Sequence, residues 1–369
     1  MDLNEYQHFA QIDREDMLGH IMGLPLQLEK AWHLGKNQPL TGIQPVERII
    51  LAGMGGSAIG GDLLASYAAD QLEVPFIVHR DYDLPACASG AGTLVVASSH
   101  SGNTEEVLSA FERALKNKCQ LIVVCTGGKL EALAREHHVP LWKFEHHGQP
   151  RAAVGYSFGL LLALLTRLGL LPDPEREVRA AIKGMRALQE KIDAPIPVLK
   201  NPAKRLAGQL IGRHITVFSS GFMSPVARRW KTQLNEVAKA FASFEHLPEA
   251  DHNTLTGIWN PPGSEMREFC LFLLAGEDHP RNLLRLEDQT HPHAGRDWHG
   301  SLYRRRRNTP RANVERAALW RLPGVLPGDD LRHGPYTHSP YRRAQRRNER
   351  INSSSIPADC RRDGLQFIS

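Results

Sequence analysis

The strongest constraint on the fold is a repeated pattern: a short apolar run, then a Gly- or Ser-rich turn, then a helical segment. The pattern occurs in RIILAGMGGSAIGGDLLASYAA (residues 48–69), in TLVVASSHSGNTEEVLSAFERALKN (93–117) and from QLIVVCTGG (120–128) onward. Nearly continuous apolar strands that alternate with helices are typical of a parallel, doubly wound sheet covered by helices. We therefore expect an α/β protein.

The same pattern divides the chain into segments. A second α/β unit contains the strand HITVFSSG, the helix PVARRWKTQLNEVAKAFA (225–242), the strand-like SFEHLPEADHN and the apolar FCLFLLAG. The most apolar run, YSFGLLLALLTRLGLL, is interrupted by Arg167 and is too short for a membrane span, so we expect a buried helix. The predicted segments are N-terminal helices (1–46), a first α/β unit (47–150), a helical connector (151–206), a partial second unit (207–285) and an aberrant tail (286–369).

Composition separates the tail from the rest of the chain. Residues 286–369 contain 16 arginines, no lysine and 9 acidic residues, a net charge of +7, whereas the residues before them carry −2. Periodicity also stops at Leu286, and beyond it we expect no sustained strand or helix face apart from the short ERAALWRL. The run of Arg304 to Arg307 is the kind of block that suggests nucleic-acid binding, but few aromatics and no recognisable motif accompany it.

The cysteines and the first residues indicate the compartment. Five scattered cysteines show no zinc-ligand spacing, which favours reduced thiols, and the start MDLNEYQHFAQIDRED is too polar and acidic for a secretory signal. We expect a cytoplasmic protein with no metal, no membrane contact and no nucleic-acid partner.

A loop rich in hydroxyl side chains follows the apolar run TLVVA. In SSHSGNTEEVL, Ser99, Ser101 and Thr104 offer hydroxyls, and Gly102 allows a tight turn. A helix that begins near Thr104 directs free N–H groups and the positive end of its dipole at the loop. A single Ser or Thr here is more often only a helix cap. The S-x-S-G-x-T pattern after a buried strand instead favours a phosphate-monoester site.

A glycine-rich turn follows the preceding strand. GMGGSAIGGD contains Gly55, Gly56 and Ser57, and it suits either a dinucleotide fingerprint or the close approach of a sugar to the backbone. Ala58 stands at the third glycine position of the fingerprint, although HRDY (79–82) follows the next strand, where a ribose contact would be sought. The neighbouring hydroxyl-rich loop favours the sugar.

Several motifs carry a family resemblance. The loop SSHSGNTEE resembles the sugar-phosphate loop of SIS (sugar isomerase) domains. Together, MLGHIMGLPLQLEKAW, GMGGSAIGGD, RRWKTQLNE and PEADHN are similar, in matching order, to the bifunctional phosphoglucose/phosphomannose isomerases. The resemblance spans roughly Asp16 to Leu286. It implies two SIS-type subdomains in a homodimer with active sites at the interface, and the loss of pattern after Leu286 indicates that the second subdomain is incomplete. It also implies cofactor-free interconversion of glucose 6-phosphate or mannose 6-phosphate with fructose 6-phosphate.

The resemblance assigns a base to the predicted helix 225–242. Glu236 matches the family's proton-shuttling glutamate, and aldose–ketose isomerisation needs such a base to move a proton between C1 and C2. Trp230, Leu234, Val237 and Phe241 form the apolar face of this helix in the sequence pattern, which places Glu236 at its edge. Without the resemblance, Glu236 would be interpreted as a solvated charge.

The resemblance assigns two further catalytic residues. His252 in PEADHN matches the ring-opening histidine, which acts on the partner subunit's substrate, and Arg151 in QPRAAVGYS matches the arginine that faces the enediolate. Both residue types are otherwise common at surfaces, as a loop imidazole and a helix-start charge. His100 occupies the place of a tyrosine in the phosphate loop, which we expect to affect packing more than chemistry.

Other functions remain open from the residues alone. A non-catalytic SIS protein that only binds sugar phosphates would share both loops, and Glu236 and His252 in their motifs argue against it. A nicotinamide-dependent oxidoreductase would use GMGGSA. A nucleic-acid-binding protein would use the arginines of the tail and would show steep salt dependence.

One residue implied by the family has no counterpart. The resemblance implies a ring-opening lysine near the C-terminus, after a threonine in a P-T-P context, but no lysine follows Lys239. Codon degeneracy permits the tail to be read one nucleotide later, so that LYRRRRNTPRANVER becomes LYTAEGETPLAQMWS and the end regains PTP and LKEEMKG. If the 369-residue chain is the true product, we expect a damaged second subdomain, little or no isomerase activity and poor solubility.

We therefore predict a single-nucleotide insertion near the codons of Arg285 and Leu286. Resequencing the gene across this point is expected to show that the downstream codons encode the family pattern in the shifted frame. Downstream codons that cannot encode LYTAEGETP and PTP in any frame would contradict the hypothesis.

Overall fold

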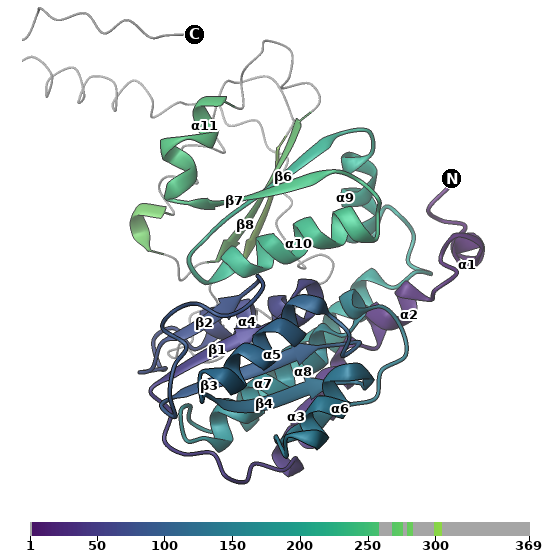
Figure 1. The fold of residues 1–369 in the computed structure, drawn as a ribbon. Helices are drawn as coiled ribbons and strands as arrows, with labels where there is room; N and C mark the ends of the chain where they lie inside the picture. Colours follow the sequence, from purple (N-terminus) through teal and green to yellow (C-terminus); the bar gives the residue numbers. More distant parts are fainter. Residues whose placement is uncertain (1, 258–267, 276–278, 283–298, 305–369) are drawn as a thin grey trace, which may run out of the picture. The chain divides into compact units, whose positions relative to one another are not determined.

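The computed structural model describes residues 2–257, 268–275, 279–282 and 299–304 (Figure 1). Over these residues, strands and helices alternate to give two sheets. The first sheet has the strand order β2-β1-β3-β4-β5 and the second β7-β6-β8-β9. Neighbouring strands are parallel in every pair. The predicted α/β class with two parallel sheets is confirmed.

The chain begins with helices, as predicted. Asp16 caps one of them by accepting a hydrogen bond from the backbone N–H of Gly19. The helices are η1 (Tyr6–His8), α1 (Phe9–Ile12), α2 (Met17–Met22) and α3 (Leu24–Asn37).

The first sheet has a strand-order reversal beside its central strands. Its elements are β1 (Arg48–Ala52), α4 (Gly55–Tyr67), β2 (Phe76–His79), β3 (Thr93–Ser99), α5 (Glu105–Lys116), β4 (Gln120–Cys125), α6 (Gly128–Glu136) and β5 (Leu141–Lys143). β1 pairs with β2 on one side and β3 on the other. Loops that follow β1 and β3 therefore leave the same edge in opposite directions, which is where open α/β sheets bind ligands.

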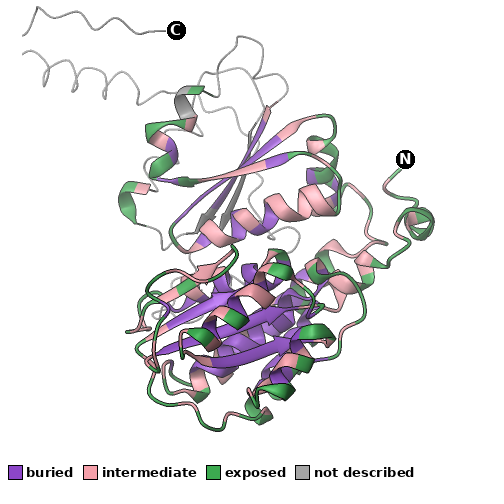
Figure 2. Ribbon diagram, in the orientation of Figure 1, coloured by how far each residue is buried: buried purple, intermediate pink, exposed green. Residues whose placement is uncertain are grey.

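Alternation along the strands gives each face of this sheet its own helices. Ile49 and Leu51 belong to the apolar cluster that contains residues of α3, α4 and α7 (Val154–Arg167), whereas Ile50 belongs to the cluster that contains residues of α5 and α6. All residues of β3 are buried. Figure 2 shows the central strands β1, β3 and β4 buried and the outer faces of the helices exposed.

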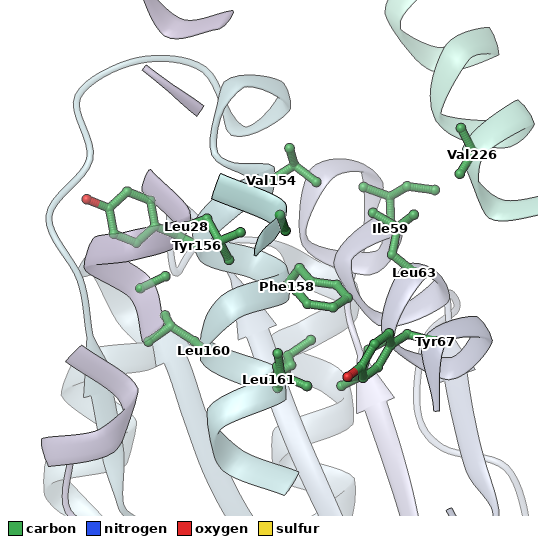
Figure 3. Close-up of a cluster of buried hydrophobic side chains, with 14 of the residues drawn as sticks. Leu28, Ile59, Leu63, Tyr67, Val154, Tyr156, Phe158, Leu160, Leu161 and Val226 are labelled. Carbon is green, nitrogen blue, oxygen red and sulfur yellow. The ribbon is translucent and has the colours of Figure 1, made fainter. Parts of the chain in front are cut away.

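The predicted connector 151–206 is helical, but its first helix is part of the first subdomain. The segment contains η2 (Pro150–Ala152), α7, α8 (Glu175–Ile192) and the start of α9 (Pro202–Leu210). Figure 3 shows Phe158 and Leu161 of α7 beside Tyr67 of α4. α7 is thus the expected buried helix. No helix in the described part of the chain is both long and apolar enough to cross a membrane.

The second sheet follows the predicted strands. Its elements are β6 (His214–Ser220), η3 (Gly221–Met223), α10 (Ser224–Glu236), β7 (Ala242–Leu247), η4 (Glu249–His252), α11 (Thr254–Gly257), β8 (Glu268–Ala275) and β9 (His299–Arg304). Residues of both sheets, such as Ile49 and Val217, share one apolar cluster.

The predicted helix 225–242 was too long at its C-terminal end. α10 ends at Glu236, and Lys239 has a left-handed backbone (φ 55°), which a helix does not contain. Asn235 then accepts a hydrogen bond from the N–H of Ala242, where β7 begins (2.8 Å). Val237 and Phe241 therefore lie outside the helix and are exposed, so they do not extend its apolar face.

The expectation of no sustained strand after Leu286 was wrong for β9. This strand pairs in parallel with β8, from Cys270–His299 to Ala275–Arg304, and it includes the first arginine of the tetra-arginine run. In the described sheet β9 lies beside β8 alone, so its backbone forms hydrogen bonds to a neighbouring strand on one side only. Side-chain periodicity is a weak signal for such a strand. The predictions for residues 286–298 and 305–369 lie outside the described residues.

Glu175, the first residue of α8, links this helix to α3. Its carboxylate accepts hydrogen bonds from Trp32 Nε1 (2.5 Å), Lys36 Nζ (2.9 Å) and Arg179 Nε (2.7 Å). These donors, Trp32 first, lower the pKa of Glu175 from its usual value to about 2.

A lowered pKa in the folded state predicts acid sensitivity. Glu175 contributes stability above its unfolded pKa, and that contribution is lost as the pH falls from about 4 toward 2. We expect Glu175→Gln to lower the free energy of unfolding by roughly 1–2 kcal/mol at pH 7 after solvent screening, and by little near pH 2. Urea titrations across this range measure the difference. Glu190→Gln, an exposed change on the same helix, is the matched control, and an equal effect of both variants would contradict the assignment.

Candidate active site

The loop after β3 forms the turn that its sequence predicts. Ser99 Oγ lies 2.8 Å from Thr104 Oγ1 and accepts a hydrogen bond from the N–H of Gly102 (3.0 Å). Thr104 is the N-cap residue of α5, yet its side chain does not bond to the amides of the first turn. The simple capping role is therefore not filled, and those N–H groups remain available to an anion.

Gly102 is required where this loop turns. Its φ is +68°, and a Cβ there would lie 1.8 Å from the carbonyl oxygen of Gly127. No other residue fits without moving the backbone of the loop that follows β4. Ser101 is exposed at the tip, and its Oγ accepts a hydrogen bond from the N–H of Asn103 (3.2 Å).

The glycine-rich turn after β1 lies against the hydroxyl-rich loop that follows β3. Ser57 Oγ accepts a hydrogen bond from the N–H of His100 (3.2 Å). A Cβ on Gly56 would lie 2.4 Å from the carbonyl oxygen of Pro150 and 3.3 Å from the N of Arg151. Gly55, with φ +46°, opens α4, and a Cβ at that position would face open space. The close approach is therefore made by Gly56, and its neighbour is the chain that carries Arg151.

Arg151 and Glu236 meet directly. Arg151 Nη1 donates to Glu236 Oε2 at 2.9 Å, with side chains that are 22% and 38% exposed. Arg151 lies in η2, before α7, and Glu236 is the last residue of α10. Two residues 85 positions apart in the sequence thus form one partly buried pair of a carboxylate and a guanidinium.

His252 is not joined to this pair. It is the last residue of η4, it is exposed, and no hydrogen bond or ion pair links it to Arg151 or Glu236 among the described residues. The predicted residues of the two loops, Arg151 and Glu236 are therefore connected through direct contacts within one chain, whereas His252 stands apart from them.

A dinucleotide site would need Arg80 to be free to contact a ribose, but its side chain is paired within the protein. Asp62 of α4 accepts from Arg80 and also from Arg228 Nη1 of α10 (3.1 Å). This arrangement links α4 to α10 and gives Arg80 a structural partner. No cluster of three or more metal-ligating side chains occurs within the described ranges.

Sequence reasoning missed a group of histidines beside the hydroxyl-rich loop that follows β3. His100 Nε2 lies 2.9 Å from His146 Nδ1, and the ring of His146 lies 5.2 Å from that of His20. Burial, and then the nearby imidazoles of His100, His20 and His147, lower the pKa of His146 to about 4. Burial also lowers the pKa of His100, which favours the neutral form of its ring.

Two family models match the chain. Residues 42–165 match the SIS domain, and residues 199–290 match the bacterial phospho-glucose isomerase C-terminal SIS domain. A bifunctional phosphoglucose/phosphomannose isomerase from Caldicellulosiruptor bescii is 37% identical over 73% of this chain and 80% of its own length. One from Aquifex aeolicus is 32% identical over 66% of this chain and 72% of its own length.

More distant similarities cover related proteins. A D-glucosamine-6-phosphate 4-epimerase from Sulfolobus acidocaldarius is 30% identical over 59% of this chain and 66% of its own length. The tagatose-6-phosphate ketose/aldose isomerase structure from Escherichia coli has a TM-score of 0.54 at 17% identity, covering 72% of this chain and 74% of that one. The structural match supports the fold alone.

The partly buried imidazole of His146 predicts a loss of stability in mild acid. Because its folded pKa lies below the unfolded value of about 6.5, His146 favours the folded state at higher pH, and this contribution falls as the pH drops toward 4. We expect His146→Gln to reduce the drop in unfolding free energy between pH 7.5 and 5.0 by about 1–2 kcal/mol. Urea denaturation at both values measures it. The control is His33→Gln, a change at an exposed histidine of α3, and an unchanged pH dependence in His146→Gln would refute the prediction.

Proposed function

Because this chain belongs to the bifunctional phosphoglucose/phosphomannose isomerase family, we propose that it interconverts glucose 6-phosphate and mannose 6-phosphate with fructose 6-phosphate. The observation that carries the proposal is the 2.9 Å contact between Arg151 and Glu236. Transfer of a proton next to a carbonyl needs a base and a fixed cation, and here these two groups lie side by side.

The proposed chemistry moves one carbon-bound proton and one hydroxyl proton and leaves no net redox change. The Glu236 carboxylate takes the proton from C2 of the open-chain aldose, the C2 electron pair forms the C1–C2 double bond, and the C1=O electron pair moves onto O1 to give a cis-enediolate. The carboxylic acid then returns the proton to C1, while the proton of the C2 hydroxyl passes to O1 and the C2=O bond forms, which gives the ketose. The guanidinium of Arg151 stabilises the negative oxygen of the enediolate, because a preorganised charge in a partly dry site acts strongly on a developing oxyanion.

The phosphate group is proposed to sit at the two joined loops. Ser101 and Thr104 provide hydroxyls, and α5 provides first-turn amides without a side-chain cap. Ser99 is buried at 2% exposure and bonds within the loop, so its proposed part is to hold Thr104 and Gly102 in place. Gly55, where a Cβ would meet open space, and Ser57 are proposed to let the sugar approach the backbone between this loop and Arg151, whereas Gly56 packs against the carbonyl of Pro150.

His252 is proposed to complete the site of a second copy of the chain. It is exposed and separate from the Arg151–Glu236 pair of its own chain, as the resemblance implies for a histidine that opens the sugar ring across a homodimer interface. An imidazole can both give and take a proton near neutral pH.

The absent C-terminal lysine limits the step that precedes proton transfer. No lysine follows Lys239 in this chain, so ring opening is expected to limit turnover, whereas the proton-transfer pair is present. The alternative favoured by the missing lysine is a protein that binds sugar phosphates without turning them over. Solvent-hydrogen exchange distinguishes the two, because a catalytic base exchanges a C1 hydrogen of open-chain fructose 6-phosphate even when net turnover is slow.

We expect Glu236→Gln to abolish the exchange. The full chain incubated with fructose 6-phosphate in deuterated water should place deuterium at C1, as read by proton NMR, and should show slow aldose formation in a coupled assay. Removing the base should lower both rates by about 10²–10⁴-fold. Adding the shifted-frame C-terminus should raise aldose formation more than it raises exchange.

Control variants distinguish the loss of the base from a general loss of folded protein, and they test whether the site is shared between two subunits. Glu190→Gln, an exposed carboxylate change on α8, should leave both rates unchanged. Mixing the Glu236→Gln and His252→Asn chains after joint refolding should restore activity through mixed dimers, since one site then receives both intact groups. Exchange by Glu236→Gln at the unaltered rate, or binding without any exchange by the original chain, would overturn the proposed function.

A further inference from the structure

Two buried polar side chains reach the short turn that carries Arg151. Arg229 Nη2 of α10 donates to the carbonyl oxygen of Arg151 at 2.5 Å. Gln27 Nε2 of α3 donates to the next carbonyl oxygen, that of Ala152, at 2.9 Å. Consecutive carbonyls of η2 are thus held by donors from two different helices.

Burying the charged side chain of Arg229 costs free energy, which indicates that this residue has a specific structural role. It is only 3% exposed, and its Nε has no hydrogen-bond partner in the described ranges. Burial lowers its pKa to about 10, while the charge of Glu236 opposes this effect. The guanidinium is therefore still charged at neutral pH. A buried cation is costly unless its partners compensate for lost water, and this one donates to the turn that carries Arg151.

Gln27 supports the turn from the other side. It is 8% exposed, and its Oε1 has no partner among the described residues. Gly155 lies close beside it, since a Cβ at that position would come within 2.7 Å of Gln27 Cβ. The side chain is thus packed tightly where α3 meets the start of α7, with its amide directed at Ala152.

Gly56 of α4 makes the third contact with the turn Pro150–Ala152. A Cβ there would collide with the carbonyl oxygen of Pro150 at 2.4 Å, so η2 rests directly on the backbone of the glycine-rich turn. The turn Pro150–Ala152 is therefore contacted by α3, α4 and α10.

The helix that carries the base also carries one of these anchors. Arg229 and Glu236 are seven residues apart on α10, which places them on the same face two turns apart. A movement of α10 thus moves both Glu236 and the group that holds the backbone of Arg151.

We propose that Arg229 and Gln27 are positioning residues that clamp the Pro150–Ala152 turn against Gly56 and so fix the guanidinium of Arg151 opposite the Glu236 carboxylate. The catalytic consequence rests on the proposed function, whereas the clamp itself is a property of the fold. Neither side chain touches substrate: both act on the backbone of the residue that does. An error of an ångström in such a pair is enough to slow a reaction by about 100-fold.

The decisive variants are Arg229→Met, Arg229→Lys and Gln27→Met, made in the full chain. Methionine keeps length and apolar packing but removes the donors, and lysine keeps a charge and a donor. Arg228→Met is the matched control, because Arg228 is the adjacent arginine on α10 and pairs with Asp62 instead. Thermal unfolding of each variant identifies any that do not fold.

The first readout does not depend on activity. The amides of Ala152 and Ala153 bond to Gln149 and Pro150 within the turn, so backbone hydrogen exchange of the peptide 149–154, measured by mass spectrometry, reports how firmly the turn is held. We expect Arg229→Met and Gln27→Met to raise its exchange rate by about 10-fold or more, as for a locally opened segment. Arg228→Met should leave that peptide as in the parent chain.

The second readout is catalytic. For C1 exchange of fructose 6-phosphate, Arg229→Met should lower kcat by about 10- to 100-fold with KM nearly unchanged, because the phosphate loops remain intact. Arg229→Lys should recover part of the loss. A merely destabilised protein would instead lose kcat in proportion to its unfolded fraction, and lowering the temperature would restore it.

Unchanged exchange of the 149–154 peptide in Arg229→Met would overturn the clamp. If that variant does not fold, Gln27→Met decides by the same measurement, and parent-like exchange of the peptide in Gln27→Met would overturn the clamp equally. A parent chain that shows no C1 exchange would refute the proposed function, while the peptide measurement would still decide whether the clamp exists.

Discussion

The contact of α10 with α4 is the constraint on which the candidate site depends. Val226 of α10 belongs to the same apolar cluster as Ile59 and Leu63 of α4 (Figure 3). Asp62, between those two residues, also accepts from Arg228 of α10. Burial of this apolar surface supplies most of the free energy that holds the two helices together, and the partly exposed ion pair adds little to it. With α10 held there, its last residue, Glu236, comes within reach of Arg151.

The electrostatics of the site are divided between its two ends. At the loops that follow β1 and β3, positive potential comes from backbone amides, because burial lowers the pKa of His100 and keeps its ring neutral at physiological pH. At the other end, the charges are the side chains of Arg151, Glu236 and the buried Arg229. A hexose 6-phosphate has the matching division, with its dianion at C6 and its proton chemistry at C1 and C2.

The fold and much of the site could be predicted from the sequence because their signals are local. Apolar strands, Gly102 at a positive φ and Thr104 at the start of α5 are each visible within a few residues. The end of α10 was misjudged because helix propensity continues through VAKAFA, and only tertiary structure sets the left-handed Lys239. Arg229 was missed since an arginine on a helix is normally solvated. His146 was missed because its partners lie on distant segments.

The order of these residues in the chain separates two parts of the proposed reaction. Glu236, Arg151, both loops and the two clamp residues lie before residue 253, on elements packed into the apolar cores of the described sheets. The second family match ends at residue 290, close to where the composition of the chain changes. The lysine implied for ring opening would lie beyond that point. A shift of reading frame there would therefore remove a group that prepares the substrate while leaving the proton-transfer pair and its supports intact. For the proposed reaction, we therefore expect exchange at C1 to depend on the described residues, and net turnover to depend also on the group that the frame shift removes.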